Sequence, residues 1–380
     1  MKVLVTNCTR NSGLAVMRAL SHAGWNVEAA DDRALAFGLR SRCAAGAYAW
    51  LPHEDSPRFT DELLSLLDRK KPDVMIPTRG IEAACRARAA LAARTRCLLP
   101  TPESFEIIND KARLLERCAA LNIARPRVFA THEAVQFLRD TPGSSIVIKP
   151  RRDVGGGHNV HIVSDPSAVP AIHQRVSVEH GGALISDYIP GPTENLRAVQ
   201  LLFDSDSRLI AFFVMRKLRI WPAGVGVTVA AVSTHDTELV TTLVPLLQQL
   251  RWQGPADAEF KIDQRDGVAR ILEINPRFSG AVHFPIACGV NMPLLYCRAA
   301  LGEQLAEAVQ PSYAAGMHYL DTGRWLAGLL AELKSPQSNP WAVLRHGWQE
   351  ELRRPRVRSV HALSDPGPLL AKLFGTRSDA

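Results

Sequence analysis

The sequence predicts a mixed α/β protein that begins with a doubly wound parallel sheet and continues as an α+β region. Over residues 1–100, short apolar runs alternate with segments of helical apolar spacing, a pattern typical of βαβ units. Between residues 183 and 274, strand-like runs dominate, and Asp266-Gly267 is a hairpin signal between the last two. A chain of 380 residues is long enough for two or three domains.

The N-terminal unit follows from its apolar runs. Lys2–Thr6 and Asn26–Ala30 are strand-like, and Gly13–Ala23 between them has helical spacing. Pro72–Pro77 is a short buried strand that lies between helical segments at 60–70 and 81–92. The turn after the first strand lacks GxGxxG, so a dinucleotide site is not favoured.

A second region begins after Leu99, where Thr101 is an expected N-cap and Pro102 the first helical residue. Ser145–Pro150 is an expected strand that ends in a glycine-rich loop. Residues after about 311 are less regular. The remaining expected helices are 102–108, 110–121, 131–139, 235–250, 279–288 and 292–301, and the remaining expected strands are 183–189, 196–203, 209–217, 225–232, 256–263 and 268–274.

Composition excludes several classes of protein. With 46% hydrophobic and 22% charged residues, the chain is neither disordered nor a disulfide scaffold. No apolar run approaches the roughly 18–20 residues of a membrane span, and the N-terminus lacks a signal-peptide pattern. The seven cysteines form no CxxC, so a reduced, cytoplasmic location is expected.

Net charge is weak evidence about partners. The value of +7 comes from 45 basic and 38 acidic residues, and only nine of the basic residues are lysine. Such a charge does not by itself favour nucleic acid. The arginine-rich stretch 345–358 is interpreted as a solvated face in preference to a polyanion contact. Because lysines are scarce, their positions are informative.

The strongest chemical pattern is Glu273-Ile274-Asn275-Pro276-Arg277 at the end of a predicted strand. Alternation places Glu273, Asn275 and Arg277 on one face. Carboxylate and amide oxygens suit Mg²⁺, and a guanidinium suits phosphate. Glu259 lies on the paired strand and can face Glu273 across the hairpin. A salt-bridged strand end with surface acids remains an alternative.

Lysines and glycines form the second pattern. Lys149 ends a strand and precedes the loop that contains Gly155, Gly156 and Gly157, whose backbone amides could close over phosphates. The order of motifs differs from that of protein kinases, and no P-loop is present. Lys111 stands at a helix start, which is unfavourable unless an anion lies nearby. The alternatives are that the glycines form an ordinary loop and that Lys111 is an ordinary surface lysine.

A third pattern, residues 186–194, is an apolar strand that runs into a Pro/Gly turn followed by an acid. The order of these segments resembles the ATP-grasp superfamily, and within it the carboxylate–amine ligases related to the ATP-grasp halves of carbamoyl phosphate synthetase. The resemblance covers roughly residues 1–305. It implies an N-terminal doubly wound parallel-sheet (pre-ATP-grasp) domain followed by a two-lobed ATP-grasp fold. The implied segments are a pre-ATP-grasp domain at 1–100, a nucleotide-binding lobe at 101–190, a metal and catalytic lobe at 191–310, and a C-terminal extension at 311–380.

The resemblance also implies residue roles. The nucleotide-binding residues it implies are Lys111 and Lys149 on phosphates, Gly155, Gly156 and Gly157 in a mobile loop, Asp187, Tyr188 and Ile189 at the adenine, and Glu194 at the ribose. The implied ligands of two Mg²⁺ ions, for which Mn²⁺ is a substitute, are Glu259, Glu273 and Asn275. Arg277 would neutralise the transferred phosphoryl group, and Lys217 or Arg219 would reach the γ-phosphate or the substrate.

The sequence departs from the family pattern in three places. Asp187 stands where glutamate is commoner, and Thr193 precedes Glu194, which leaves the ribose contact open between the two. The Gln-Val-Glu run of biotin carboxylases does not follow Arg277, which disfavours bicarbonate–biotin chemistry.

The implied activity is ATP-dependent ligation of a carboxylate and an amine, with amino acids among the candidates, through an acyl phosphate and with release of ADP and phosphate. An ATP-binding module that acts as a nucleotide switch is the alternative, and a basic nucleic-acid-binding protein is a less favoured third. Dimers are common in the family, so a homodimer is a further expectation.

Overall fold

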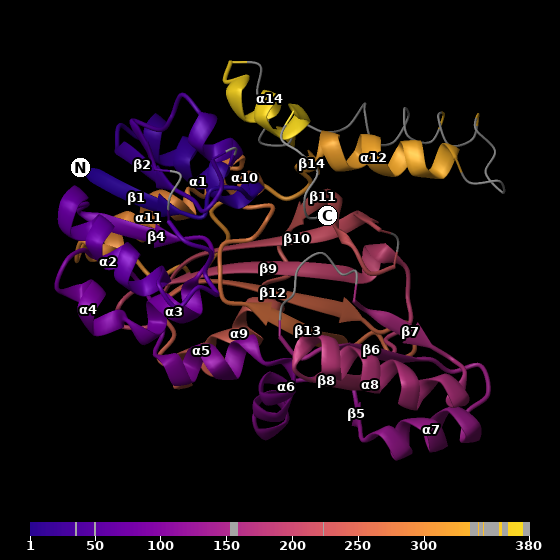
Figure 1. Ribbon diagram of the computed structural model, residues 1–380. Helices are drawn as coiled ribbons and strands as arrows, with labels where there is room; N and C mark the ends of the chain where they lie inside the picture. The colour runs from indigo at the N-terminus through magenta and orange to yellow at the C-terminus, as the bar shows by residue number, and fades with distance from the viewer. Residues whose placement is uncertain are drawn as a thin grey trace.

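The computed structural model describes residues 1–34, 36–48, 51–152, 159–222, 224–334, 341, 345, 357–358 and 364–374. These residues form three β-sheets with helices packed around them (Figure 1). The predicted glycines 155–157 and most of the arginine-rich stretch lie outside the described residues. No helix in the described ranges is long and apolar enough to cross a membrane.

The first sheet belongs to the N-terminal unit. Its strands are β1 (Lys2–Thr6), β2 (Asn26–Ala30), β3 (Gly46–Tyr48) and β4 (Val74–Pro77), and its helical segments are α1 (Asn11–His22), η1 (Phe37–Arg40), α2 (Phe59–Lys70), α3 (Ile81–Arg86) and α4 (Arg88–Ala92). The strand order is β3-β2-β1-β4, with every pairing parallel. Val3, Leu4 and Val5 are fully buried, as expected of a parallel sheet covered on both faces. The predicted doubly wound unit is confirmed.

The second sheet is small and antiparallel. Its strands are β5 (Val128–Phe129), β6 (Ile146–Pro150), β7 (His161–Val163) and β8 (Ala183–Asp187), and the helical segments of this region are α5 (Pro102–Asn109), α6 (Lys111–Ala120), α7 (Thr131–Asp140), η2 (Pro166–Ala168) and α8 (Val169–His180). The order is β5-β8-β6-β7. The predicted cap is confirmed, because Thr101 Oγ1 accepts a hydrogen bond from Ser104 N at 3.1 Å and Pro102 begins α5.

The third sheet is the largest and carries most of the chemistry. Its strands are β9 (Leu196–Phe203), β10 (Leu209–Trp221), β11 (Val227–Thr234), β12 (Gly254–Ile262), β13 (Ala269–Asn275), β14 (His318–Leu320) and β15 (Val357–Arg358), and the helical segments around it are η3 (Thr193–Asn195), α9 (Thr237–Gln249), α10 (His283–Ala287), α11 (Met292–Ala300), α12 (Thr322–Leu333) and α14 (Gly367–Phe374). The order is β13-β12-β9-β10-β11-β14-β15, antiparallel except for the pairing of β14 with β15.

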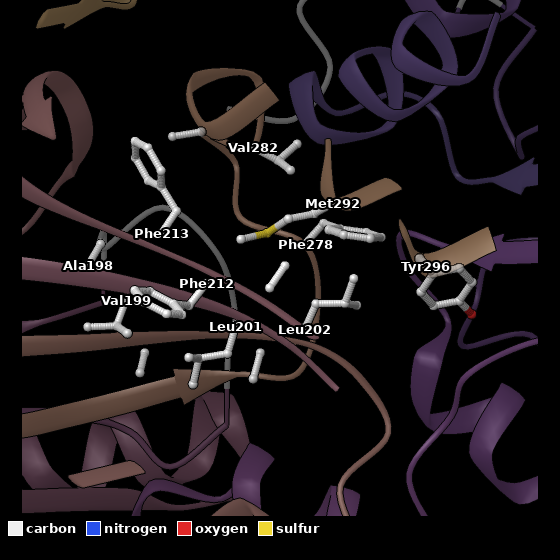
Figure 2. Packing of buried hydrophobic residues seen from close by; sticks show 14 of the residues in the cluster. Ala198, Val199, Leu201, Leu202, Phe212, Phe213, Phe278, Val282, Met292 and Tyr296 are labelled. Carbon is white, nitrogen blue, oxygen red and sulfur yellow. The ribbon is translucent and has the colours of Figure 1, made fainter. Parts of the chain in front are cut away.

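One core joins the N-terminal unit to the large sheet. Figure 2 shows Leu202 and Phe212 of the strands together with Phe278, Met292 and Tyr296, all members of this cluster. Tyr296 joins α11 to the parallel unit, because its hydroxyl accepts from Leu98 N at 2.8 Å and donates to Met75 O at 3.2 Å. The large sheet therefore packs against the parallel unit through this shared core, which includes residues of α11.

The C-terminal residues return to the N-terminal unit. Asp365 precedes α14 and is buried, and its carboxylate accepts from Ser41 Oγ at 2.6 Å, from Arg42 N at 3.0 Å and from Arg18 Nη2 at 2.8 Å. These contacts join α14 to α1 and η1.

Some elements differ from the prediction. The sequence analysis did not identify α8, α12 or β14, and β10 continues four residues beyond its predicted end at Lys217. In α12 the apolar residues do not follow one face, because Trp325 and Leu329 are buried while Leu326 and Leu330 are half exposed. In α8 only Val169 and Val176 are buried, so its periodicity is weak. The segment boundaries at 100, 190 and 310 stay a proposal.

Candidate active site

Two carboxylates form the centre of the site. Glu259 on β12 is the direct cross-strand partner of Glu273 on β13, so the predicted arrangement of the pair is confirmed. The turn of this hairpin contains Gly267, whose φ of 72° is natural for glycine. The two side chains are 27% and 28% exposed, so they remain accessible to a ligand. Facing carboxylates repel each other and therefore need cations nearby.

Lysines from two separate elements supply those cations. Lys217 on β10 is 2% exposed and donates from Nζ to Glu259 Oε1 at 2.6 Å. Lys111 is the first residue of α6, and its Nζ lies 3.4 Å from Glu273 Oε2. The anion expected near this helix start is thus present. Asp110 caps the same helix, because its Oδ1 accepts from Ala112 N at 2.9 Å.

Lys149 lies against the same carboxylates. It follows Ile148 on β6 and donates from Nζ to Leu272 O, one residue before Glu273, at 3.2 Å. Burial lowers the pKa of Lys149 to about 8, while Glu273 opposes the shift and Lys111 adds to it. A buried ammonium group with a single backbone acceptor has donors left for a phosphate oxygen.

Asn275 and Arg277 extend the site beyond the end of β13. Asn275 is buried, and its Nδ2 donates to Glu273 Oε1 at 3.2 Å. Arg277 Nη2 lies 3.4 Å from Asn275 Oδ1. The structure therefore brings Glu273, Asn275 and Arg277 together, as the alternation predicted.

The sequence analysis assigned no role to a second polar pair beside these residues. Asp257 and Gln200 are 6% and 2% exposed and face each other across β12 and β9. Burial, and next the negative charge of Glu259, raise the pKa of Asp257 to about 7, whereas Arg277 and Lys217 oppose the rise. A usable signal was present, because Gln200 is the only polar residue in the apolar run from Ala198 to Phe203.

The segment expected to contact the adenine, which we call the hinge, begins at the end of β8, an inner strand of the small sheet. Asp187 ends β8, and its carboxylate accepts from Arg127 N at 2.6 Å and from Arg265 Nη2 at 3.4 Å. Burial nevertheless raises the pKa of Asp187. Tyr188 lies beneath Lys261, whose Nζ is 4.7 Å from the ring centroid. Ile189 is 3% exposed. Asp187 thus joins the segment at Arg127 to the hairpin turn at Arg265.

The remaining predicted residues, Glu194, Lys217 and Arg219, lie in three different surroundings. Glu194 lies in η3 and is exposed, and its backbone carbonyl accepts from Arg197 Nη1 at 2.6 Å. Lys217 lies inside the carboxylate cluster, whereas Arg219 forms an ion pair with Glu332 on α12. A register shift in β10 between these two residues accounts for the difference, because it breaks the alternation that would give them one direction.

The oxygen ligands fit a hard divalent cation. Glu259, Glu273 and the Asn275 amide offer carboxylate and carbonyl oxygens on adjacent strands, and the two acids are balanced by lysines in this structure. Within the described ranges no three His, Cys, Asp or Glu side chains gather to hold a metal. Magnesium is commonly bound by one or two carboxylates plus substrate phosphates, so this donor set suits a metal that arrives with a nucleotide.

Comparisons with known proteins agree with this geometry. A family model described as "ATP-grasp in the biosynthetic pathway with Ter operon" matches residues 186–322, which include the hinge, β9–β13 and both carboxylates. The large chain of carbamoyl phosphate synthase from Xanthomonas axonopodis pv. citri is 22% identical over 66% of this chain and 24% of its own length. The biotin carboxylase domain of 2-oxoglutarate carboxylase from Hydrogenobacter thermophilus, solved with MgADP, has a TM-score of 0.66 at 18% identity and covers 83% of this chain and 73% of that one. Residues 186–322 therefore match an ATP-grasp family, in agreement with the resemblance seen in the sequence.

A further relative matches a shorter stretch. A D-aspartate ligase of Enterococcus faecium is 26% identical over 29% of this chain and 26% of its own length. The chain spans about a quarter of the length of the two curated relatives named here. The likeness to the biotin carboxylase domain is a likeness of fold.

Proposed function

We propose that this chain is an ATP-dependent carboxylate–amine ligase, which forms an amide or peptide bond through an acyl phosphate and releases ADP and phosphate. One observation carries the proposal. Lys111, Lys149 and Lys217 come from three separate elements and converge on the facing carboxylates Glu259 and Glu273. Such a concentration of cations around two acids suits a polyphosphate with divalent ions.

The reaction requires charge neutralisation more than a nucleophilic side chain. A carboxylate oxygen of the substrate attacks the γ-phosphorus while the bond to the β-phosphate oxygen breaks and ADP leaves. The amine nitrogen then attacks the acyl carbon, phosphate leaves, and the amine loses a proton. Both partners of the first step are anionic, so fixed positive charges lower its barrier.

The side chains of the site divide this work. Lys149 and Lys111 would hold nucleotide phosphates, and Arg277 would stabilise the phosphoryl group in transfer. Tyr188 and Ile189 would face the adenine, while Thr193 or Glu194 would meet the ribose. Glu259, Glu273 and Asn275 would hold two Mg²⁺ or Mn²⁺ ions, which neutralise phosphate charge when bound. Of the two candidates for the γ-phosphate, we favour Lys217 because Arg219 is paired with Glu332.

Small molecules are the proposed substrates. The match to a D-aspartate ligase supports an amino acid as one of them. Biotin carboxylation is not proposed, because the sequence after Arg277 is Phe278-Ser279-Gly280 and lacks the Gln-Val-Glu run of biotin carboxylases. All seven cysteines are free thiols, which suits a cytoplasmic enzyme. A homodimer remains part of the proposal by analogy with the family.

The test is ADP release by the full chain with Mg²⁺, ATP and a panel of amino acids and small carboxylates with amines. Turnover that requires both a carboxylate and an amine would support the proposal. Glu273→Gln should abolish that turnover, and Glu303→Gln, which alters a half-exposed surface pair with Arg298, serves as the matched control. Nucleotide binding without turnover across the panel would favour the nucleotide switch instead.

A further inference from the structure

A row of buried polar side chains crosses three strands of the large sheet. Gln200 on β9 lies opposite Asp257 on β12, and Asp257 lies opposite Asn275 on β13. Next to this row along the strands lie Glu259 and Glu273, two residues away. Because strand side chains alternate, the two rows share one face of the sheet. The polar row therefore continues the surface of the proposed metal site.

Two members of the row carry buried polar atoms that lack hydrogen-bond partners among the described residues. Both polar atoms of the Gln200 side chain and Oδ1 of Asp257 are buried without a partner among the described residues. Leaving a buried donor or acceptor unpaired costs about 1–3 kcal/mol, so native proteins rarely keep several together.

The surroundings of Asp257 show what chemistry this space faces. Glu259, Arg277, Lys217 and Ser279 are the neighbours that act on the Asp257 carboxylate. Arg277 and Lys217 belong to the proposed phosphoryl-transfer residues. The unpaired atoms thus lie beside the side chains proposed to act in phosphoryl transfer, and not in a separate part of the molecule.

We infer that Asp257 and Gln200 bind the amino group of the amine substrate. Asp257 Oδ1 and Gln200 Oε1 are two acceptors, and an amino group supplies two or three N–H donors. Gln200 Nε2 is left to donate to an oxygen of the same molecule, as the carboxylate of an amino acid would allow. This inference rests on the proposed function and narrows its substrate class to amines with an oxygen acceptor close to the nitrogen.

Other occupants match the row less well. A carboxylate would meet the negative oxygen of Asp257, and a purely apolar group would leave all three atoms unpaired. An ordered water could satisfy two or three of the groups, and the experiment therefore has to separate a water from an amine.

The experiment measures binding to the full chain loaded with MgADP. Calorimetric titrations use the twenty protein amino acids and D-aspartate, each compared with its amine-free analogue, such as propionate for alanine and succinate for aspartate. At least one amino acid is expected to bind, with its analogue at least about tenfold weaker. Gln200→Leu and Asp257→Asn should each weaken amino acid binding about tenfold and leave the MgADP Kd within about twofold.

Control variants separate the outcomes. Gln253→Leu alters a partly buried glutamine that bonds to Ser205 O and Arg88 outside the site, and it should bind the amino acid like the wild type. Equal binding of amines and analogues, wild-type amine affinity in Gln200→Leu, or no binding by any amino acid to MgADP-loaded protein would overturn the inference and leave a water as the occupant. Failure of the wild type to bind MgADP would instead overturn the proposed function, and the inference with it.

Discussion

Glu259 on β12 lies directly opposite Glu273 on β13, and each carboxylate is paired with a lysine from a different element. Lys217 pairs with Glu259, and Lys111 pairs with Glu273. The lysines balance the repulsion between the acids. They are therefore placed to exchange a carboxylate partner for a phosphate oxygen when a nucleotide binds.

Replacing one acid should separate metal-dependent from metal-independent binding. Glu273→Gln is expected to lower ATP turnover at least about 100-fold, because a ligand that neutralises phosphate charge is lost. In EDTA, ADP should bind to this variant as well as to the wild type or more tightly, because Lys111 no longer has a competing carboxylate. Fluorescence titration with ADP, with and without Mg²⁺, measures both quantities. Full turnover in the variant would contradict the proposed metal site.

Lysine should be required at two positions where arginine keeps the charge. Lys149 donates to a backbone carbonyl within a confined space, and Lys111 is 8% exposed beside Glu273. A planar guanidinium needs more room than a compact ammonium group, so Lys149→Arg and Lys111→Arg should each weaken ADP binding about tenfold. Lys334→Arg on an exposed site is the control for the substitution itself. Unchanged ADP affinity in both variants would mean that charge alone is recognised.

Much of this site could be predicted from the sequence because it lies on a hairpin. The strand spans and the turn at Asp266-Gly267 place Glu259 and Glu273 on the two strands of one hairpin, whereas their direct pairing also requires the register shift between Glu259 and Phe260. Lys111 and Lys149 were identified only as candidates, since their approach to Glu273 depends on how α6 and β6 pack against the large sheet.

Other features depend on tertiary contacts that local pattern does not encode. The separation of Lys217 from Arg219 arises from a register shift in β10, and the partner of Arg219 lies more than a hundred residues away on a helix that the sequence analysis did not identify. The pairing of Gln200 with Asp257 required the order of strands in the sheet, because β9 and β12 are not consecutive along the chain.

Asp31 should make stability depend on pH in the N-terminal unit. This fully buried carboxylate follows β2 and accepts from Thr9 Oγ1 at 2.7 Å, yet burial raises its pKa from 3.8 to about 6. The folded state therefore binds more protons than the unfolded state between these values, and stability falls as the pH rises through them.

The comparison of wild type with Asp31→Asn isolates this effect. The variant mimics the neutral carboxyl group, so its free energy of unfolding relative to the wild type should improve by about 1–3 kcal/mol from pH 4 to pH 7. Urea unfolding at both pH values provides the measurement. A relative stability that does not change with pH would show that folding does not raise the pKa of Asp31.

The contacts of Asp365 should hold the C-terminal segment in place. Arg18 and Asp365 are 11% and 8% exposed in their side chains, so Asp365→Ala leaves a largely buried guanidinium unpaired. A loss of about 3 kcal/mol in the free energy of unfolding is expected, along with faster proteolytic cleavage before α14. Glu303→Ala breaks a half-exposed pair and should cost less than about 1 kcal/mol. Equal losses in both variants would show that Asp365 contributes no more than a surface acid.

Lys217 and Arg219 should differ sharply in their effect on turnover. Lys217 is buried against Glu259 within the carboxylate cluster, while Arg219 pairs with Glu332 on α12. Removal of a cation that acts on the transferred phosphoryl group costs about 100-fold or more in kcat, whereas the loss of a distant ion pair acts mainly on stability. Lys217→Met should therefore reduce kcat at least about tenfold more than Arg219→Met. Parallel thermal unfolding separates the two causes, because Arg219→Met should lower Tm in the same way as Glu332→Gln. If Arg219→Met reduced kcat as much as Lys217→Met without a change in Tm, Arg219 would be the residue that contacts the γ-phosphate or substrate, and its pairing with Glu332 would be replaced during the reaction.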